Sequence, residues 1–138
     1  MGIKQISVFL ENTTGRICEV TRTLAQAGVN LRAINIADTA DFGILRLIVD
    51  KTDVAVKALT AAGFTTRQTT VAAVEIEDKP GSLDKLMEII QKSGINIEYL
   101  YASLEGSSGK AVVIFKLEDN EKGFALLEES GLPMADRF

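Results

Sequence analysis

The chain has 138 residues, of which 46% are hydrophobic and 25% are charged, and its formal net charge at pH 7 is −4. This composition is typical of a globular protein and argues against a disordered one. No apolar run reaches the ~20 residues that span a bilayer, no signal-peptide pattern is visible, and one cysteine cannot form an internal disulfide, so we expect a cytoplasmic protein without a membrane partner.

Charge is divided unevenly between the two halves of the chain. Residues 1–70 hold eight basic and six acidic side chains, whereas residues 71–138 hold seven and thirteen. Nucleic-acid-binding proteins gain much of their affinity by neutralising phosphates with a basic surface. An acidic chain without a basic stripe does not match that pattern, so we expect no nucleic acid partner.

The first half shows strand and helix patterns in the order β-α-β-β-α-β. Apolar and polar side chains alternate at the start, as in a strand with one buried face. The predicted segments are a strand at 3–10, a helix that ends at Gly28, strands at 29–37 and 42–49, a helix at 52–62 and a strand at 64–70. Gly28 and Gly63 follow the two helices, where glycine is favoured.

The first predicted helix has an amphipathic pattern. Ile17, Val20 and Leu24 are spaced so that they share one apolar face, which predicts that all three point to the core. Thr13 or Thr14 is expected to cap the start of this helix, because a hydroxyl oxygen can accept from the free backbone N–H groups there.

The second half repeats the same order. Its first helix has a clearer apolar face, formed by Leu83, Leu86, Met87 and Ile90. The predicted segments are a strand at 72–76, this helix up to Gly94, strands at 95–102 and 111–117, a helix at 120–130 with Phe124 and Leu127 inward, and a last strand at 132–138. The last strand is short and contains Pro133, which cannot donate a ladder hydrogen bond.

Two short motifs recur at a constant shift of 66 residues. Glu11-Asn12-Thr13-Thr14-Gly15-Arg16-Ile17 corresponds to Glu77-Asp78-Lys79-Pro80-Gly81-Ser82-Leu83, and Gly28-Val29-Asn30-Leu31 corresponds to Gly94-Ile95-Asn96-Ile97. This indicates an internal duplication with two domains, 1–70 and 71–138. The predicted fold class is α+β: two ferredoxin-like βαββαβ repeats, each an antiparallel sheet with helices on one face.

The second repeat resembles the ACT domain, because a strand, the Glu-Asp-Lys-Pro-Gly-Ser-Leu turn, an amphipathic helix and Gly-Ile-Asn-Ile follow in that order. The first repeat resembles a variant, with Thr14 in place of Pro80. The resemblance implies a regulatory module that pairs side by side and binds a small ligand, most often an amino acid, near the first strand–helix turn. It also implies a homodimer and, as a further partner, a metabolic enzyme or regulator that the protein controls.

An amino acid ligand needs hydrogen-bond donors for its carboxylate and acceptors for its ammonium group. A helix N-terminus supplies free N–H groups and partial positive charge, and glycine lets a ligand approach the backbone closely. With the cross-interface geometry that the resemblance implies, one expected set is Asn12, Thr13, Thr14, Gly15, Arg16 and Ile17 with Asn96 and Ile97. The reciprocal set is Asp78, Lys79, Pro80, Gly81, Ser82 and Leu83 with Asn30 and Leu31.

Other interpretations of these residues remain open. Asn, Asp, Ser, Thr, Pro and Gly are common in any strand–helix turn, so the turns could be structural and the repeats could serve assembly alone. The chain has no histidine and one cysteine, and no catalytic residue, metal ligand or cofactor is predicted, so an enzyme is not expected. RNA-recognition modules share the strand order, but the central strands lack their basic–aromatic signature.

Overall fold

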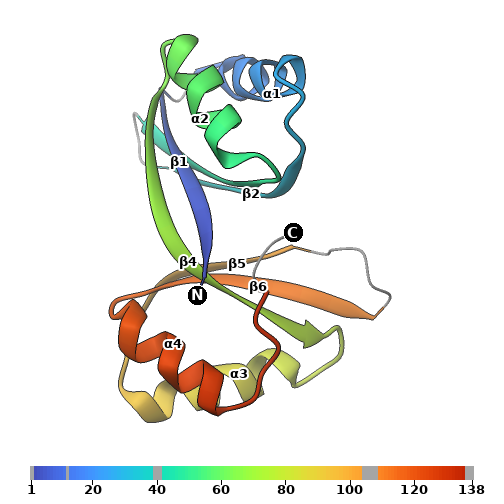
Figure 1. The fold of residues 1–138 in the computed structure, drawn as a ribbon, viewed down its shortest axis with the longest axis vertical. Helices are drawn as coiled ribbons and strands as arrows, with labels where there is room; N and C mark the ends of the chain where they lie inside the picture. The colour runs from blue at the N-terminus through green and yellow to red at the C-terminus, as the bar shows by residue number, and fades with distance from the viewer. Residues whose placement is uncertain (1, 12, 39–41, 104–108, 136–138) are drawn as a thin grey trace. The chain divides into compact units, whose positions relative to one another are not determined.

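The computed structural model of the protein describes residues 2–11, 13–38, 42–103 and 109–135 (Figure 1). These residues form two compact units, which are considered separately below. Residues Lys4–Thr69 form the first, and the chain from Thr70 onward, with Gly2 and Ile3, forms the second. In each unit two helices cover one face of an antiparallel sheet, which confirms the predicted α+β class (Figure 1).

The first unit contains a sheet in the order β2-β3-β1-β4, with two helices packed on it. Its elements are β1 (Ile3–Glu11), α1 (Arg16–Gln26), β2 (Leu31–Asp38), β3 (Phe42–Val49), α2 (Thr52–Ala61) and the first part of β4 (Thr65–Glu77). The pairs β1–β3 and β2–β3 are antiparallel. All these segments were predicted, with boundaries that differ by up to two residues where helices and strands end.

The core of the first unit lies between the sheet and the two helices. Alternate residues of β1 enter it, as period two requires, and they pack with Val20 and Leu24 of α1 and Leu59 of α2. The predicted inward positions of Val20 and Leu24 are therefore confirmed. The prediction for Ile17 is wrong, because this side chain is 44% exposed at the first turn of the helix.

The second unit has a sheet in the order β4-β6-β5. Its elements are the second part of β4, α3 (Ser82–Ser93), β5 (Ile97–Ser103), β6 (Lys110–Leu117) and α4 (Asn120–Glu129). The two strands predicted at 64–70 and 72–76 form one continuous strand, β4, of 13 residues. The domain boundary predicted between residues 70 and 71 falls inside this strand.

The last predicted strand, at 132–138, is reduced to one bridge among the described residues. Met134 bridges Val74 in antiparallel fashion. The amide of Glu75 donates to the Pro133 carbonyl at 2.9 Å, and the amide of Ala135 donates to the Ala73 carbonyl at 2.8 Å. Proline at position 133 offers only a carbonyl to the ladder, which agrees with this minimal pairing. Residues 136–138 lie outside the described part.

The second core repeats the arrangement of the first. Leu86 and Ile90 of α3 and Phe124 and Leu127 of α4 are buried against Phe115 of β6. Met87 is half-buried at the border of this core. These positions confirm the predicted apolar faces, with the exception of Leu83, which is exposed. Leu83 therefore repeats the behaviour of Ile17: in both units the first apolar residue of the helix remains on the surface.

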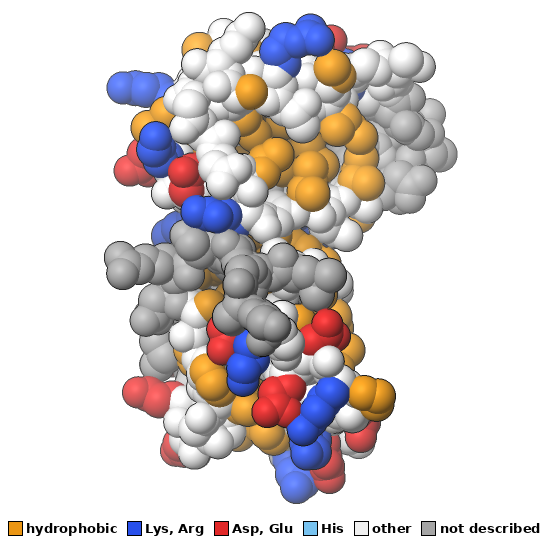
Figure 2. All heavy atoms as spheres, turned by 90° about the vertical axis from the view of Figure 1, so that its right-hand side faces the viewer, with side chains coloured by type: hydrophobic (Ala, Val, Ile, Leu, Met, Phe, Trp, Pro, Cys, Tyr) orange, Lys and Arg blue, Asp and Glu red, His pale blue; other side chains and the backbone are white. Residues whose placement is uncertain are grey.

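Several large hydrophobic side chains of the described residues are exposed, and Figure 2 shows that such side chains gather at the surface of the first unit. Ile34 and Ile36 of β2 are about half exposed, although they pair with the core residues Leu47 and Leu45 of β3. Directly opposed residues share one face of a sheet. The two isoleucines therefore lie on the helix-covered face, at an edge strand that the helices leave open.

Replacing Phe115 by alanine is expected to destabilise the second unit by about 3–5 kcal/mol, because Phe115 is fully buried and its truncation leaves a cavity. Val54 on α2 is exposed, and Val54→Ala is expected to change the free energy of unfolding by less than about 0.5 kcal/mol. Urea denaturation followed by circular dichroism measures both. Equal effects of the two substitutions would contradict this assignment of the core.

Candidate functional site

The two predicted turns share one backbone conformation. Gly15 precedes α1 with φ 89° and ψ −10°, and Gly81 precedes α3 with φ 90° and ψ −12°. This left-handed region disfavours every residue with a Cβ, which explains glycine at both positions. A Cβ built on either glycine would meet no atom within 4 Å. The glycines are thus required by backbone conformation, and the space beside them is open.

The start of α1 has no side-chain cap, contrary to the expectation for Thr13 and Thr14. The helix begins one residue later than a threonine cap requires, with Gly15 in the capping position. The Arg16 amide makes a long contact of 3.4 Å with the Thr13 carbonyl, and the first regular helical bond accepts at Gly15. Within the described ranges, no group accepts from the amides of Ile17 and Cys18.

The start of α3 repeats this pattern. Gly81 is the capping residue, and no side chain caps the helix. The Ser82 amide lies 3.3 Å from the Lys79 carbonyl. The amides of Leu83 and Asp84 have no acceptor in the part of the chain that the structure describes. Each turn therefore presents two free backbone donors and the positive end of a helix dipole.

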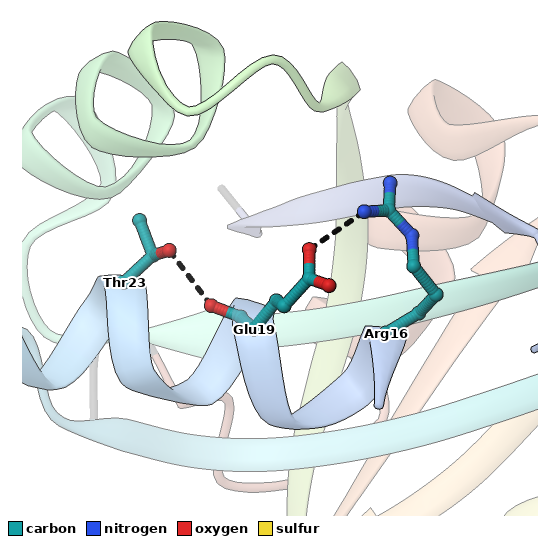
Figure 3. A network of polar contacts seen from close by, with 3 residues as sticks. All are labelled: Arg16, Glu19 and Thr23. Carbon is teal, nitrogen blue, oxygen red and sulfur yellow. Dashed lines mark hydrogen bonds and ion pairs between the residues drawn. The ribbon is translucent and has the colours of Figure 1, made fainter. Parts of the chain in front are cut away.

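Arg16 is engaged within the first unit, and the structure does not leave it extended beside the turn. Its Nη1 lies 2.6 Å from Oε2 of Glu19, and its guanidinium lies over the Phe64 ring at 4.8 Å from the centroid. Figure 3 shows Arg16 reaching along α1 to Glu19, whose backbone carbonyl accepts from the Thr23 hydroxyl at 2.7 Å. A role of Arg16 as the partner of a ligand carboxylate would require it to leave these contacts.

The predicted residues at the start of β2 and β5 make structural contacts. The Asn30 amide donates to Oδ1 of Asp50 at 2.9 Å, and Leu31 borders the first core. The Asn96 carbonyl accepts from Glu118 at 3.0 Å, and Ile97 borders the second core.

These residues do not lie beside the turn of their own repeat. Leu31 pairs with Val49 at one end of β3, whereas Glu11, just before the turn, pairs with Phe42 at the other end. Helix α1, about 16 Å long, separates the two segments in the chain. The pairing of each turn with the second strand of the other repeat stays a prediction, and Asn12 lies outside the described residues.

The sequence reasoning missed a cluster of charged side chains beside the second turn. Nζ of Lys79 lies 2.5 Å from Oε2 of Glu77. The pKa of the Glu77 carboxyl lies below its ordinary value, mainly because Lys79 donates a hydrogen bond to it. The positive charges of Lys79, Lys110 and Lys85 lower this pKa further. The signal in the sequence was the number of lysines near Gly81, but the approach of Lys110 to this turn depends on the antiparallel pairing of β4 with β6.

Among the described residues, no group of three or more His, Cys, Asp or Glu side chains is placed to hold a metal ion. Across those same residues, the helices are too short and too polar for any of them to cross a bilayer.

Lys79→Gln is expected to raise the pKa of the Glu77 carboxyl towards its ordinary value, because the largest cause of its depression is removed. Folding lowers this pKa, so the interaction stabilises the protein above the unfolded-state value and is lost as pH falls through the folded-state value. Carbon-detected NMR titration of the glutamate side chains measures this change. Lys92→Gln, at the far end of α3, is the control, and an equal shift in that variant would contradict the proposed cause.

Comparisons with known proteins agree with this geometry. The sequence matches the family described as an ACT domain pair over residues 1–133. The crystal structure of protein BT0572 from Bacteroides thetaiotaomicron is similar with a TM-score of 0.91 and 38% identity, over 98% of this chain and 92% of that one. A search of curated proteins found no match.

A more distant similarity concerns the fold alone. The ligand-free regulatory subunit of aspartate kinase from Thermus thermophilus has a TM-score of 0.68 and 21% identity, over 95% of this chain and 92% of that one. The corresponding subunit from Thermus flavus has a TM-score of 0.63 and 19% identity, over 95% and 94%. With two βαββαβ units, two equivalent glycine turns and a family match over nearly its whole length, the chain belongs to the ACT domain family as an ACT domain pair.

Proposed function

We propose that the protein is a regulatory protein that binds a small molecule, in the first place an amino acid, at the Gly15 and Gly81 turns. The observation that carries this proposal is the pair of uncapped helix starts, where free amides lie beside an open glycine. Side chains usually satisfy such amides. The absence of a capping side chain at equivalent positions of both repeats favours a ligand as the acceptor of these amides.

The chemistry of the turn suits a zwitterion. A ligand carboxylate at the helix start would accept from the free amides and interact with the positive end of the dipole. In the second repeat, Asp78 is exposed and can accept from the ligand ammonium group. In the first repeat, the exposed hydroxyls of Thr13 and Thr14 take the corresponding role. The two turns therefore offer the same backbone donors with different acceptors.

The family and the fold support a regulatory role without catalysis. One structure with the same fold is named as the regulatory subunit of aspartate kinase. We infer that this protein likewise acts on a separate partner, a metabolic enzyme or a regulator of one. A cytoplasmic location is part of this proposal and rests on the composition and the single cysteine.

Self-association is the second part of the proposal, and an assembly module without ligand is the alternative function. Ile34 and Ile36 form an exposed apolar surface on the edge strand β2. In the second unit Leu100, the equivalent of Ile34 at a shift of 66, is also exposed on an edge strand. An edge strand with apolar side chains is a template for pairing with another chain, so we propose a homodimer.

An amino acid that binds the folded protein is expected to raise its melting temperature. At a ligand concentration of 100 times Kd, the stabilisation is about 2.7 kcal/mol. A thermal-shift screen of the twenty amino acids at millimolar concentration checks this. No shift with any amino acid, for a protein that unfolds cooperatively, would sink the amino acid hypothesis and leave the assembly function.

Gly15→Ala and Gly81→Ala are expected to reduce this ligand-dependent shift, because the added methyl group enters the open space beside the free amides. The matched controls are Gly28→Ala and Gly94→Ala, which also replace left-handed glycines but lie at the ends of the helices. All four are expected to lose about 1–2 kcal/mol of stability from backbone strain. A site at the turns requires that the controls keep the ligand-dependent shift.

Ile34→Lys is expected to convert a dimer into a monomer, because it places a charge in the apolar surface of β2. Val54→Lys, at a similarly exposed apolar position on α2, is the control and is expected to leave the dimer intact. Size-exclusion chromatography with light scattering measures both. A monomeric wild-type protein at high concentration would refute the proposed assembly.

A further inference from the structure

The two repeats differ at the place where the first helix meets the last strand of the repeat. In the first repeat, the Arg16 side chain occupies this place: its guanidinium lies over Phe64 and pairs with Glu19. The Nε atom of Arg16 is buried. A long side chain thus packs between the start of α1 and the residue that precedes β4.

The equivalent positions of the second repeat carry different residues. At the shift of 66, Arg16 corresponds to Ser82 and Glu19 to Lys85; at the shift of 68 that relates Gly63 to Gly131, Phe64 corresponds to Leu132. The arginine, its aromatic platform and its carboxylate partner are therefore all replaced. A groove of about 420 Å³ lies at this place, lined by Glu75, Ile76, Glu77, Lys79, Ser82, Lys85, Leu86, Lys110, Leu132 and Pro133.

One wall of the groove is apolar and the other is charged. Ile76, Leu86 and Leu132 belong to or border the second core, so the apolar wall is held in place by packing. The charged wall carries three lysines and two glutamates, although residues 71–138 as a whole are acidic. Figure 2 looks onto the end of β4 and the start of α3, and it shows basic and acidic side chains side by side on the second unit.

The net charge of the side chains on this wall is positive. Lys79 pairs with Glu77, so these two charges offset each other. Lys85 and Lys110 both line the groove, and their charges lower the pKa of the Glu77 carboxyl. Neither of them has a hydrogen bond or an ion pair within the described part of the chain. Two lysines without an ion pair thus line a groove in which Glu75 is the one carboxylate not held by Lys79.

We propose that this groove binds a small organic anion with an apolar body, such as a branched aliphatic carboxylate, and that only the second repeat has this site. The anionic group would pair with Lys85 and Lys110, and the apolar body would cover Ile76, Leu86 and Leu132. The volume lies in the range of small-molecule sites. The groove adjoins the amino acid site proposed at the free amides of Leu83 and Asp84 and shares Lys79 and Ser82 with that turn, so this inference extends the proposed function and gives the two repeats different ligand sets.

The test uses the full chain labelled with nitrogen-15 and 4-methylpentanoate as the probe, with amide chemical shifts as the readout. We expect saturable shifts at Ser82, Lys85, Lys110 and Leu132. The neutral 4-methylpentan-1-ol and inorganic phosphate, at matched ionic strength, are each expected to bind more weakly, since one lacks the charge and the other the apolar body. Shifts confined to other parts of the chain, or equal affinity for either comparison compound, would overturn the proposal.

Substitutions of lysine distinguish binding at a specific site from general electrostatic attraction of the anion to surface lysines. The double substitution Lys85→Gln and Lys110→Gln is expected to weaken binding by about tenfold or more. Lys92→Gln removes an exposed lysine from the same helix and is expected to leave affinity unchanged. Equal weakening in both variants would show nonspecific charge attraction and refute the site.

A second pair of substitutions rebuilds the packing of the first repeat. Ser82→Arg with Leu132→Phe introduces the arginine and its aromatic platform, and is expected to fill the groove and abolish binding while the protein remains folded. Retained affinity in the folded variant would contradict the assignment. A carboxylate probe could also bind the free amides of the Gly81 turn, so Gly81→Ala separates the two sites: binding in the groove is expected to survive this substitution. Loss of binding in Gly81→Ala together with unchanged affinity in the double lysine variant would place the probe at the turn and refute the groove.

Discussion

The burial of one sheet face beneath two helices is the constraint on which the rest of each unit depends. It commits alternate residues of every strand to the core, as Ile6, Val8 and Leu10 show in β1. The helices cover the central strands and leave the edge strand partly open, so Ile34 and Ile36 remain exposed on the same face. It also fixes where each helix must begin, and the glycine before it provides the required left-handed backbone.

The uncapped helix starts follow from that geometry. A threonine or aspartate at the capping position would satisfy the first amides but would not adopt φ near +90° without strain. Glycine resolves the strain and leaves the amides free, so the same residue creates both the turn and its free backbone donors. Backbone donors do not depend on the neighbouring side chains, so the two turns offer the same free amides although Thr14 stands in one and Pro80 in the other.

Much of the fold could be predicted from the sequence because its signals are local and occur twice. Alternation predicted β1, helical spacing predicted α1 and α3, and the repeated glycines marked the helix ends. The errors concern features that depend on tertiary context. Ile17 and Leu83 fit the apolar stripe by spacing, but both lie at the first turn of their helix, where the core does not cover them. The predicted threonine cap failed because Gly15 occupies the capping position. The groove beside Ser82 could not be predicted, since it depends on which side chain fills the space next to Leu132.

The single strand β4 has a consequence for how the chain tolerates length changes. Ala72 and Val74 of β4 belong to the core beneath α3 and α4, and Ile76 borders it. A one-residue deletion within this part of the strand would reverse the alternation and turn core-facing residues of the second unit outward. Only even-numbered changes of length between Ala72 and Ile76 therefore keep the same side chains in this core, whereas the first part of β4 contributes no residue to the first core and is free of that limit.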